Sequence, residues 1–457
     1  MRIEYTGLSE VQGSLITLEG VTGVAFDELA EISLEKGERR YGRVIQVDGD
    51  KVVLQVFEGT TGISMEGVHT RFTGRPIMLP LSKEILGRVF SGTGTPLDGL
   101  REVFAEERRD INGAPINPVS RQYPRSCILT GVSAIDSVAT LIRGQKLPIF
   151  SGAGMSHNEL AAQIVRQAQV MGDEDEFAIV FCAMGVKNDT AEYFRKDFEE
   201  SGALGRVVMY LNMASDPIIE RILAPRCALT AAEFLAFKHG YHVLVIMTDI
   251  SSYCEALREF SSSKGEIPSR KGFPSYMYSD LASLYERAGM IRGEAGSVTL
   301  VPILTMPNDD ISHPIPDLTG YITEGQIVLS RDLEQKGIYP PVDILPSLSR
   351  LMKDGIGEGY TREDHADISN QLFASYSMVA DARSLASVIG EDELSYIDRK
   401  YIEFGRRLEQ EFVNQSQRED RTLDETMEIA WNLLSILPRT ELGRISDKLL
   451  DENYRRV

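Results

Sequence analysis

Cysteine is scarce in this sequence, and long apolar runs and internal repeats are absent. The four cysteines, Cys127, Cys182, Cys227 and Cys254, lie far apart and form no C-x-x-C pair. This spacing fits neither a disulfide framework nor a zinc ribbon, and it favours a reducing compartment. No stretch of about 18 apolar residues occurs, and the first residues lack the basic start and apolar core of a secretion signal. We therefore expect neither a membrane-spanning segment nor secretion.

Positive charge is also in short supply. The chain has 48 Lys and Arg residues against 68 Asp and Glu residues, which gives a formal net charge of -20 at pH 7. A field of that sign repels the phosphate backbone that a nucleic-acid-binding protein must neutralise, so nucleic acid is not an expected partner. His239 and His242 have a spacing that metals can use, but no carboxylate or cysteine close by completes a ligand set. No metal site is expected either.

What the sequence does contain is an ordinary globular composition, arranged in three successive patterns. With 42% hydrophobic and 25% charged residues in a length of 457, it predicts roughly two to four domains. The first pattern consists of short β-like runs at 14–18, 41–47 and 51–57, and the turn Asp48-Gly49-Asp50 between the last two is typical of a hairpin. These features predict a small antiparallel β-barrel or sandwich over residues 1–76.

The second and third patterns divide the rest of the chain. Over residues 77–360, buried apolar runs alternate with amphipathic ones, which is typical of a parallel α/β sheet. Over residues 361–457 the β-like runs disappear, and charged stretches with regular leucines predict an α-helical domain with Trp431 in its core. The expected strands are 147–150, 178–184, 207–212, 242–248 and 298–304, and the expected helices are 158–171, 190–201, 217–238, 253–262, 362–389, 391–414 and 422–436.

A glycine-containing loop between an expected strand and an expected helix has the layout of a phosphate-binding P-loop. In a working loop, G-x-x-x-x-G-K-[ST], backbone N–H groups wrap the phosphates, a lysine adds charge and a hydroxyl holds Mg²⁺. The four defining positions are occupied here by Ser151, Ser156, His157 and Asn158. An imidazole is shorter than a lysine side chain and titrates near neutrality, and an amide replaces the hydroxyl poorly. Triphosphate hydrolysis at this loop is not expected.

Five segments together resemble one family. TGVSAID at 130–136, IRGQKLPIF at 142–150 directly before the loop, and LGRVFSGTGTPLDG at 86–99 resemble the rotary ATPases of the ATP synthase alpha/beta superfamily. GFPSYMYSDLASLYERAG at 272–289 and PPVDILPSLSRLM at 340–352 resemble in particular the non-catalytic B subunits of V-type and archaeal-type members. Taken alone, Gly152 and Gly154 would indicate only a tight turn, whereas the resemblance identifies the segment as a degenerate P-loop in a RecA-like domain.

The resemblance implies a place in a larger machine. Such B subunits alternate with catalytic A subunits in a ring of three A and three B around a central rotor stalk. It implies an N-terminal β-barrel, next to which we expect a peripheral stalk, a RecA-like middle and a C-terminal helical domain that faces the rotor. The implied location is the cytoplasmic face of a membrane, reached only through the membrane sector, in a prokaryote. ATP or ADP with Mg²⁺ would bind at the A/B interface, mainly to the A subunit, and none would be retained by this chain alone.

The resemblance also implies roles for single residues. Arg350 matches the arginine finger that a non-catalytic subunit contributes to its neighbour's active site, and Tyr321 is expected near the same interface. Val186 stands where catalytic members carry a water-activating glutamate. Asp249 matches the Walker B position and is either a Mg²⁺ ligand through water or only a structural hydrogen-bond acceptor. With Gly152, Gly154, His157 and Asn158 the loop is expected to bind nucleotide weakly or not at all.

Two other functions fit parts of the sequence. The first is an autonomous hexameric RecA-like ATPase of the flagellar or secretion type, which would use the unusual loop itself. The second is a nucleic-acid motor similar to Rho, which the net charge of -20 disfavours. The sequence does not distinguish H⁺ from Na⁺ as the transported ion, nor ATP synthesis from hydrolysis.

Overall fold

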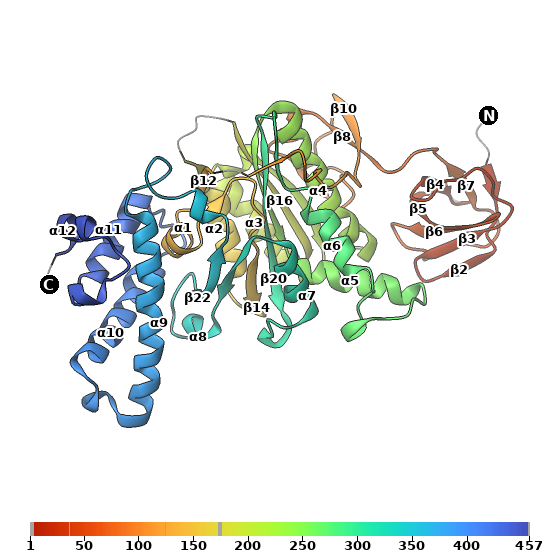
Figure 1. The fold of residues 1–457 in the computed structure, drawn as a ribbon. Coiled ribbons are helices and arrows are strands. Elements are labelled where there is room, and N and C mark those ends of the chain that lie inside the picture. Colours follow the sequence, from red (N-terminus) through yellow and green to blue (C-terminus); the bar gives the residue numbers. More distant parts are fainter. Residues whose placement is uncertain (1–3, 36, 124, 172–175, 456–457) are drawn as a thin grey trace.

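The computed structural model describes residues 4–35, 37–123, 125–171 and 176–455, and the chain forms three parts (Figure 1). The N-terminal strands and the C-terminal helices lie at opposite ends of a central α/β part. This order agrees with the three patterns in the sequence. The boundaries 1–76, 77–360 and 361–457 remain predictions.

The N-terminal part is one antiparallel sheet of seven strands around its own apolar core. The order in the sheet is β1-β7-β4-β5-β6-β3-β2. Gly49 has a φ of +63°, and the turn joins Asp48 to its partner Lys51, as the hairpin prediction required. Ile16, Ile32 and Leu54 are among its fully buried side chains. The strands are β1 (Glu4–Thr6), β2 (Glu10–Gln12), β3 (Leu15–Leu18), β4 (Leu29–Ser33), β5 (Arg39–Asp48), β6 (Lys51–Val56) and β7 (His69–Phe72).

The main strands of the central sheet are parallel except at one edge, and the short strand β19 (Gly289–Ile291) also pairs with β20 in antiparallel orientation. The main strands run in the order β22-β21-β14-β20-β18-β16-β17-β9, and every neighbouring pair is parallel except β21 and β22. The expected strands at 178–184, 207–212, 242–248 and 298–304 are all present. The strands are β9 (Val89–Ser91), β14 (Ile149–Gly152), β16 (Phe177–Val186), β17 (Val207–Met213), β18 (His242–Thr248), β20 (Ser297–Met306), β21 (Gly325–Leu329) and β22 (Val342–Ser349).

Helices cover both faces of this sheet because its strands are apolar on both sides. In β16, Val180 and Cys182 belong to the same core as α4 and α5, whereas Ile179 and Phe181 belong to the core that contains α2 and α3. Successive residues of a strand point to opposite faces, so a continuous apolar run buries both. One face carries α1 (Ser133–Val138), α2 (His157–Gln167) and α3 (Asn188–Glu200), and the other carries α4 (Ile218–His239), α5 (Ile250–Ser263), α6 (Met277–Tyr285) and α7 (Pro314–Ile322).

Short elements connect these layers. Strand β8 (Met78–Leu81) pairs with β10 (Glu107–Asp110), and β19 (Gly289–Ile291) pairs with both β20 and β11 (Arg121–Gln122). Strand β12 (Cys127–Leu129) pairs with β13 (Leu141–Ile142) and β15 (Gln169–Val170). Helix α8 (Arg331–Gln335) lies between β21 and β22 in the chain.

The C-terminal part consists of helices and packs on the central part beside β22. Its core includes Val138 from α1 and Ile344 from β22. Trp431 is only 5% exposed in this core, as predicted, and its Nε1–H donates to Asp364 at 2.7 Å. The helices are α9 (His365–Ile389), α10 (Tyr396–Arg407), α11 (Leu423–Leu434) and α12 (Asp447–Asn453).

Two expected helices were wrong in extent. The helix expected over 158–171 ends at Gln167, because residues 169 and 170 pair with β12 as a strand instead. The helix expected over 391–414 is divided into a 3-10 turn at 391–393, α10, and a π-helical stretch at 408–413. Gly390, with a φ of +88°, ends α9, and Ser395 caps a new helix with its side chain.

A buried histidine joins the C-terminal part to the central part. His365 at the start of α9 is fully buried, and its Nε2 lies 3.1 Å from the Ser137 carbonyl oxygen of α1. Its Nδ1 lies 3.0 Å from the Thr361 hydroxyl. Burial lowers the pKa of His365 to about 4, so the ring is neutral at pH 7, with Nε2–H as donor and Nδ1 as acceptor.

Protonation of His365 should therefore weaken the fold in mild acid. The unfolded chain takes up this proton near pH 6.5 and the folded chain only near 4, so the contribution is complete above pH 6.5 and is lost as the pH falls toward 4. The loss should be roughly 3 kcal/mol of unfolding free energy. Urea unfolding at a series of pH values should show a flatter pH dependence for His365→Gln than for the parent. An unchanged slope in His365→Gln would contradict this assignment.

Candidate functional site

The P-loop layout predicted from the sequence is present. Strand β14 ends at Gly152 and helix α2 begins at His157, with Gly154 between them at a φ of +76°. Gly152 is buried, Gly154 is exposed, and Asn158 is half-buried in the first turn of α2. The loop lies at the carboxyl ends of the parallel strands, where α/β sheets place their ligands.

Groups from this same chain occupy the loop. The backbone N–H of Ser156, just before α2, donates to Glu334 Oε1 at 2.9 Å. That carboxylate lies where the N-terminus of a helix would bind a phosphate. Arg331 donates to the Ala153 carbonyl oxygen at 3.1 Å and pairs with Asp309 at 2.6 Å, and both side chains lie against Gly152. The anion position is therefore filled by an internal carboxylate and bordered by an internal ion pair.

His157 does not act as a substitute for the missing lysine. Its Nδ1 lies 3.0 Å from the Ser151 hydroxyl of β14, so the ring bonds back to the strand. Burial lowers the pKa of His157, although the negative charges of Asp249, Glu159 and Glu334 oppose this shift. The imidazole is therefore predominantly neutral at pH 7 and supplies no permanent positive charge.

Asp249 acts as a structural hydrogen-bond acceptor. It follows β18 directly and caps α5, with Oδ1 accepting from the Ser251 N–H at 2.8 Å and from the Thr305 N–H at 3.2 Å. Val186 lies on the neighbouring strand β16 and offers no lone pair. Within the four described segments, no group of three or more His, Cys, Asp or Glu side chains is arranged to hold a metal ion. A role for Asp249 toward Mg²⁺ stays a prediction.

Arg350 lies at the other end of the sheet. Because β22 is antiparallel to β21, its last residue, Ser349, pairs with Gly325, the first residue of β21. The pairing of β14 with β21 places Gly325 level with Leu147. Leu147 comes five residues before Gly152, which is on the order of 15 Å along the strand. Arg350 is exposed, and its guanidinium has no hydrogen bond or ion pair with any residue that the structure describes.

Arg350 and Tyr321 line the same open cleft of about 390 Å³, and their place at an interface with another subunit stays a prediction. Tyr321, on α7, is 77% exposed. An exposed aromatic ring beside an unpaired cation is typical of a surface that another molecule covers. The lining residues are Phe150, Ile311, Pro316, Asp317, Gly320, Tyr321, Gln326 and Arg350.

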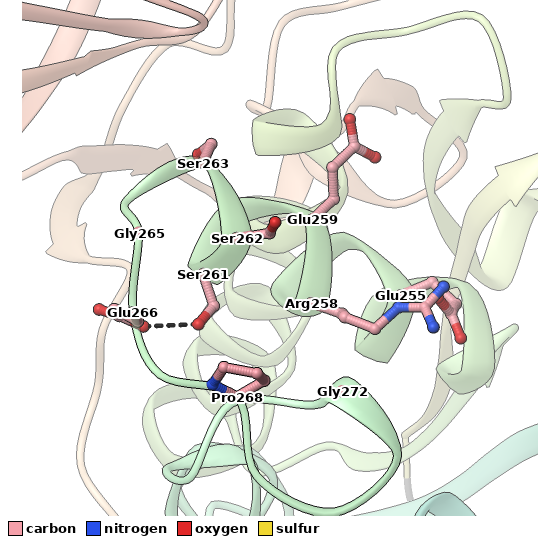
Figure 2. Close-up of a pocket in the computed structure, with 10 residues that line it drawn as sticks. All are labelled: Glu255, Arg258, Glu259, Ser261, Ser262, Ser263, Gly265, Glu266, Pro268 and Gly272. Atoms are coloured by element: carbon pink, nitrogen blue, oxygen red, sulfur yellow. Dashed lines mark hydrogen bonds and ion pairs between the residues drawn. The ribbon is translucent and has the colours of Figure 1, made fainter.

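A larger cleft, of about 790 Å³, lies at the end of α5 and the loop after it (Figure 2). Its polar groups are largely paired with one another: Ser261 donates to Glu266 at 2.7 Å, Lys264 pairs with Glu266 at 2.8 Å, and Arg258 pairs with Glu255. None of the residues that the sequence marked as functional lines it. Two candidate functional sites therefore remain. One is the cleft lined by Arg350, and the other is the degenerate loop.

Sequence reasoning missed the residues that close the loop. Glu334, Arg331 and Asp309 come from α8 and from the turn after β20, more than 150 residues beyond the loop in the chain. No local motif marks them, because their role arises only from the fold.

Comparison with known proteins identifies the three parts. The profile of the ATP synthase alpha/beta family, nucleotide-binding domain, matches residues 131–349, and that of its beta-barrel domain matches residues 8–74. The profile of the C-terminal domain of V and A type ATP synthase matches residues 354–454. The predicted fold, a β-barrel followed by an α/β nucleotide-binding domain and a helical domain, is thereby confirmed.

Whole-chain relatives agree with these matches. The V-type ATP synthase beta chain 2 of Clostridium tetani is 63% identical over 100% of this chain and 99% of its own length. The B subunit of the A-type ATP synthase of Aeropyrum pernix is 58% identical over 99% of this chain and 97% of its own. Among solved structures, the ATP synthase protein NeqB from Nanoarcheaum equitans aligns with a TM-score of 0.73 at 38% identity, covering 92% of this chain and 98% of that one.

Removal of the internal carboxylate should open the anion position. We expect Glu334→Ala to raise the affinity for inorganic pyrophosphate at least about tenfold, because like charges a few ångströms apart near a protein surface repel by ~1–4 kcal/mol. Isothermal titration calorimetry on the purified chain measures this. Asp332→Ala removes the same charge from an exposed position on the same helix and should bind like the parent. Equal binding by all three proteins would show that Glu334 does not block the loop.

Proposed function

This chain belongs to the ATP synthase alpha/beta family, among the B subunits of the V and A types, and we propose that it serves there as the non-catalytic half of an ATP site. Membership makes it part of a rotary ATPase. In the proposed arrangement the chain supplies Arg350 to a nucleotide held by a neighbouring catalytic A subunit. The placement of Arg350 carries the proposal.

The geometry around Arg350 supports action on another subunit. Its guanidinium is exposed and unpaired among the described residues, and the backbone from which it extends lies on the order of 15 Å along the sheet from Gly152. A cation that extends from the end of the sheet opposite the loop and has no partner of its own can enter a site that a neighbour completes. A guanidinium is permanently charged and binds two phosphoryl oxygens at once, and such fingers contribute about 10³–10⁵ to the rate.

The chain's own loop supports the same division of roles. It has no lysine, its histidine is neutral, Val186 replaces the water-activating glutamate, and Glu334 holds the anion position. Any one of these would weaken ATP hydrolysis, and together they leave no group to bind the γ-phosphate or activate water. We propose that ATP or ADP with Mg²⁺ binds at the A/B interface, mainly through the A subunit.

The remaining partners follow from the family. We propose a ring of three A and three B subunits, with the C-terminal helices facing the central rotor stalk and the N-terminal barrel near the peripheral stalk. Rotation would couple ATP hydrolysis or synthesis to transport of H⁺ or Na⁺ in a membrane sector, on the cytoplasmic face of a prokaryotic membrane. None of the helices in the described segments has the length and apolar character needed to cross a bilayer.

Replacement of Arg350 should abolish turnover without preventing assembly. In a ring reassembled from this chain and its A subunit, we expect Arg350→Ala to lower kcat for ATP by about 10³-fold, because charge on the transferring phosphoryl group loses its partner. Steady-state ATPase assay with size-exclusion chromatography measures both properties. Arg75→Ala removes an exposed arginine from the end of the N-terminal part and should leave kcat within about twofold. Near-normal turnover by Arg350→Ala would reject the finger.

The purified chain alone should not hydrolyse ATP, and activity should appear only on mixing with an A subunit that has an intact G-K-[ST] loop. The alternative, an autonomous hexameric ATPase, predicts turnover by the isolated chain that is lost in His157→Ala. Assays of each component and of the mixture, at equal protein concentration, distinguish the two functions.

A further inference from the structure

The main chain at Arg350 is held by buried polar groups, although its guanidinium is unpaired. The N–H of Arg350 donates to the carbonyl oxygen of Glu324 at 2.9 Å. The same carbonyl accepts from Gln145 Nε2 at 3.0 Å, and this amide also donates to the hydroxyl of Ser349 at 2.9 Å. Gln145 is fully buried and Ser349 is 5% exposed. A single buried glutamine therefore bonds both to Ser349 in β22 and to Glu324, the residue directly before β21.

Gln145 is itself fixed to the centre of the sheet. Its Oε1 accepts from the N–H of Ile142 at 2.9 Å, and its backbone carbonyl accepts from the N–H of Leu300 in β20 at 2.9 Å. The amide has its donors and its acceptor occupied, so its orientation is defined. Through Gln145, the end of the edge strand β22 is connected to β20, which lies beyond β21 and β14 in the sheet.

Glu324 is held on its other side by a buried lysine. Its carboxylate accepts from the backbone N–H of Lys146 at 2.8 Å and forms an ion pair with Lys146 Nζ at 2.8 Å. Lys146 is 2% exposed and also pairs with Glu286 at 3.2 Å, which in turn pairs with Arg121 at 2.8 Å. Buried charges that are paired on several sides keep a fixed geometry. The Glu324 carbonyl that receives the Arg350 N–H is thus anchored.

The close approach of the two strands depends on the glycine at position 325. Gly325 has a φ of +135°, and a Cβ at this position would collide with the carbonyl oxygen of Leu348. The neighbouring strand therefore approaches closely only because residue 325 lacks a side chain. The Cα of Arg350 has a set position, and only the rotamers of its side chain remain to be selected by a ligand.

We propose that Gln145 and Glu324 are positioning residues for Arg350, which aim its guanidinium at the phosphoryl group of a nucleotide in the adjoining subunit. This rests on the proposed function of Arg350. Neither residue touches the nucleotide. Their effect is to fix the backbone from which the finger extends, since misplacement of a reacting group by about 1 Å can cost ~10² in rate.

The test uses the reassembled ring and a transition-state analogue, MgADP with aluminium fluoride, because its binding can be measured even in inactive variants. Gln145→Leu removes the amide and leaves an apolar side chain of similar volume. We expect this variant to bind the analogue about tenfold more weakly than the parent and to have a kcat about tenfold lower. Its affinity for MgADP and its KM for ATP should stay within about twofold of the parent values. An interaction made only in the transition state gives this pattern. In the Arg350→Ala background, Gln145→Leu should have no further effect on analogue binding.

The chain offers a closely matched control. Gln371 in α9 is 2% exposed, and its Nε2 donates to the Ser375 hydroxyl at 2.9 Å and to the Glu441 carbonyl at 3.2 Å, while its Oε1 accepts from the Arg444 N–H at 2.9 Å. Gln371→Leu therefore removes the same kind of buried amide from a different domain. It should leave the ratio of analogue to MgADP affinity unchanged.

The outcomes separate this proposal from the function on which it rests. If Arg350→Ala binds the analogue and turns over ATP like the parent, the proposed function itself fails. If Arg350→Ala is defective and Gln145→Leu is not, the finger stands and the positioning role is overturned. Equal weakening by Gln145→Leu in the parent and in the Arg350→Ala background would also overturn it, because the effect would then be a general loss of structure.

Discussion

The antiparallel pairing of β22 with β21 is the constraint from which the functional account follows. Among the main strands of the sheet, which otherwise run parallel, this reversed strand delivers its last residue to the amino ends of its neighbours. A parallel strand in the same place would have ended beside the degenerate loop, and Arg350 would then have faced a nucleotide in its own subunit. The reversal separates the two features, so that in the proposed ring each would meet a different neighbour.

The polar groups of the loop are paired within the chain, whereas the charged group at the end of β22 is not. At the loop, the N–H of Ser156 is satisfied by Glu334, and the nearby cation Arg331 is paired with Asp309, so few groups there remain for a ligand. At Arg350 the backbone N–H is bonded to the Glu324 carbonyl oxygen, while the charged group has no partner among the described residues. An unpaired guanidinium on a rigid support is ready to bind an anion, whereas a satisfied loop is not. These two arrangements support the proposal that the chain contributes charge to a neighbouring site and does not itself bind the phosphates.

Much of the fold could be predicted, because local sequence determined it. The run at 242–248 became β18 at the predicted bounds, since seven successive buried residues leave few alternatives to a central strand. The hairpin at residues 48–51 could be predicted because its turn requires a positive φ, which Gly49 adopts. The helix expected to continue to residue 171 failed because pairing of Val170 with Ile128 overrides local preference. The loop residues His157 and Asn158 were found by spacing, but their partner Glu334 could not be, since only the folded chain brings the two regions together.

The assembled ring offers the most direct test of the central claim, that this chain completes a reaction centre held by another subunit. A cryo-electron microscopy structure of the ring with MgADP and aluminium fluoride would locate both the nucleotide and Arg350. The account predicts the guanidinium within hydrogen-bond distance, about 2.7–3.2 Å, of a fluoride on nucleotide bound to the A subunit, with the loop at 151–158 closed by Glu334. Nucleotide seated in that loop, with Arg350 distant from every phosphoryl analogue, would contradict it.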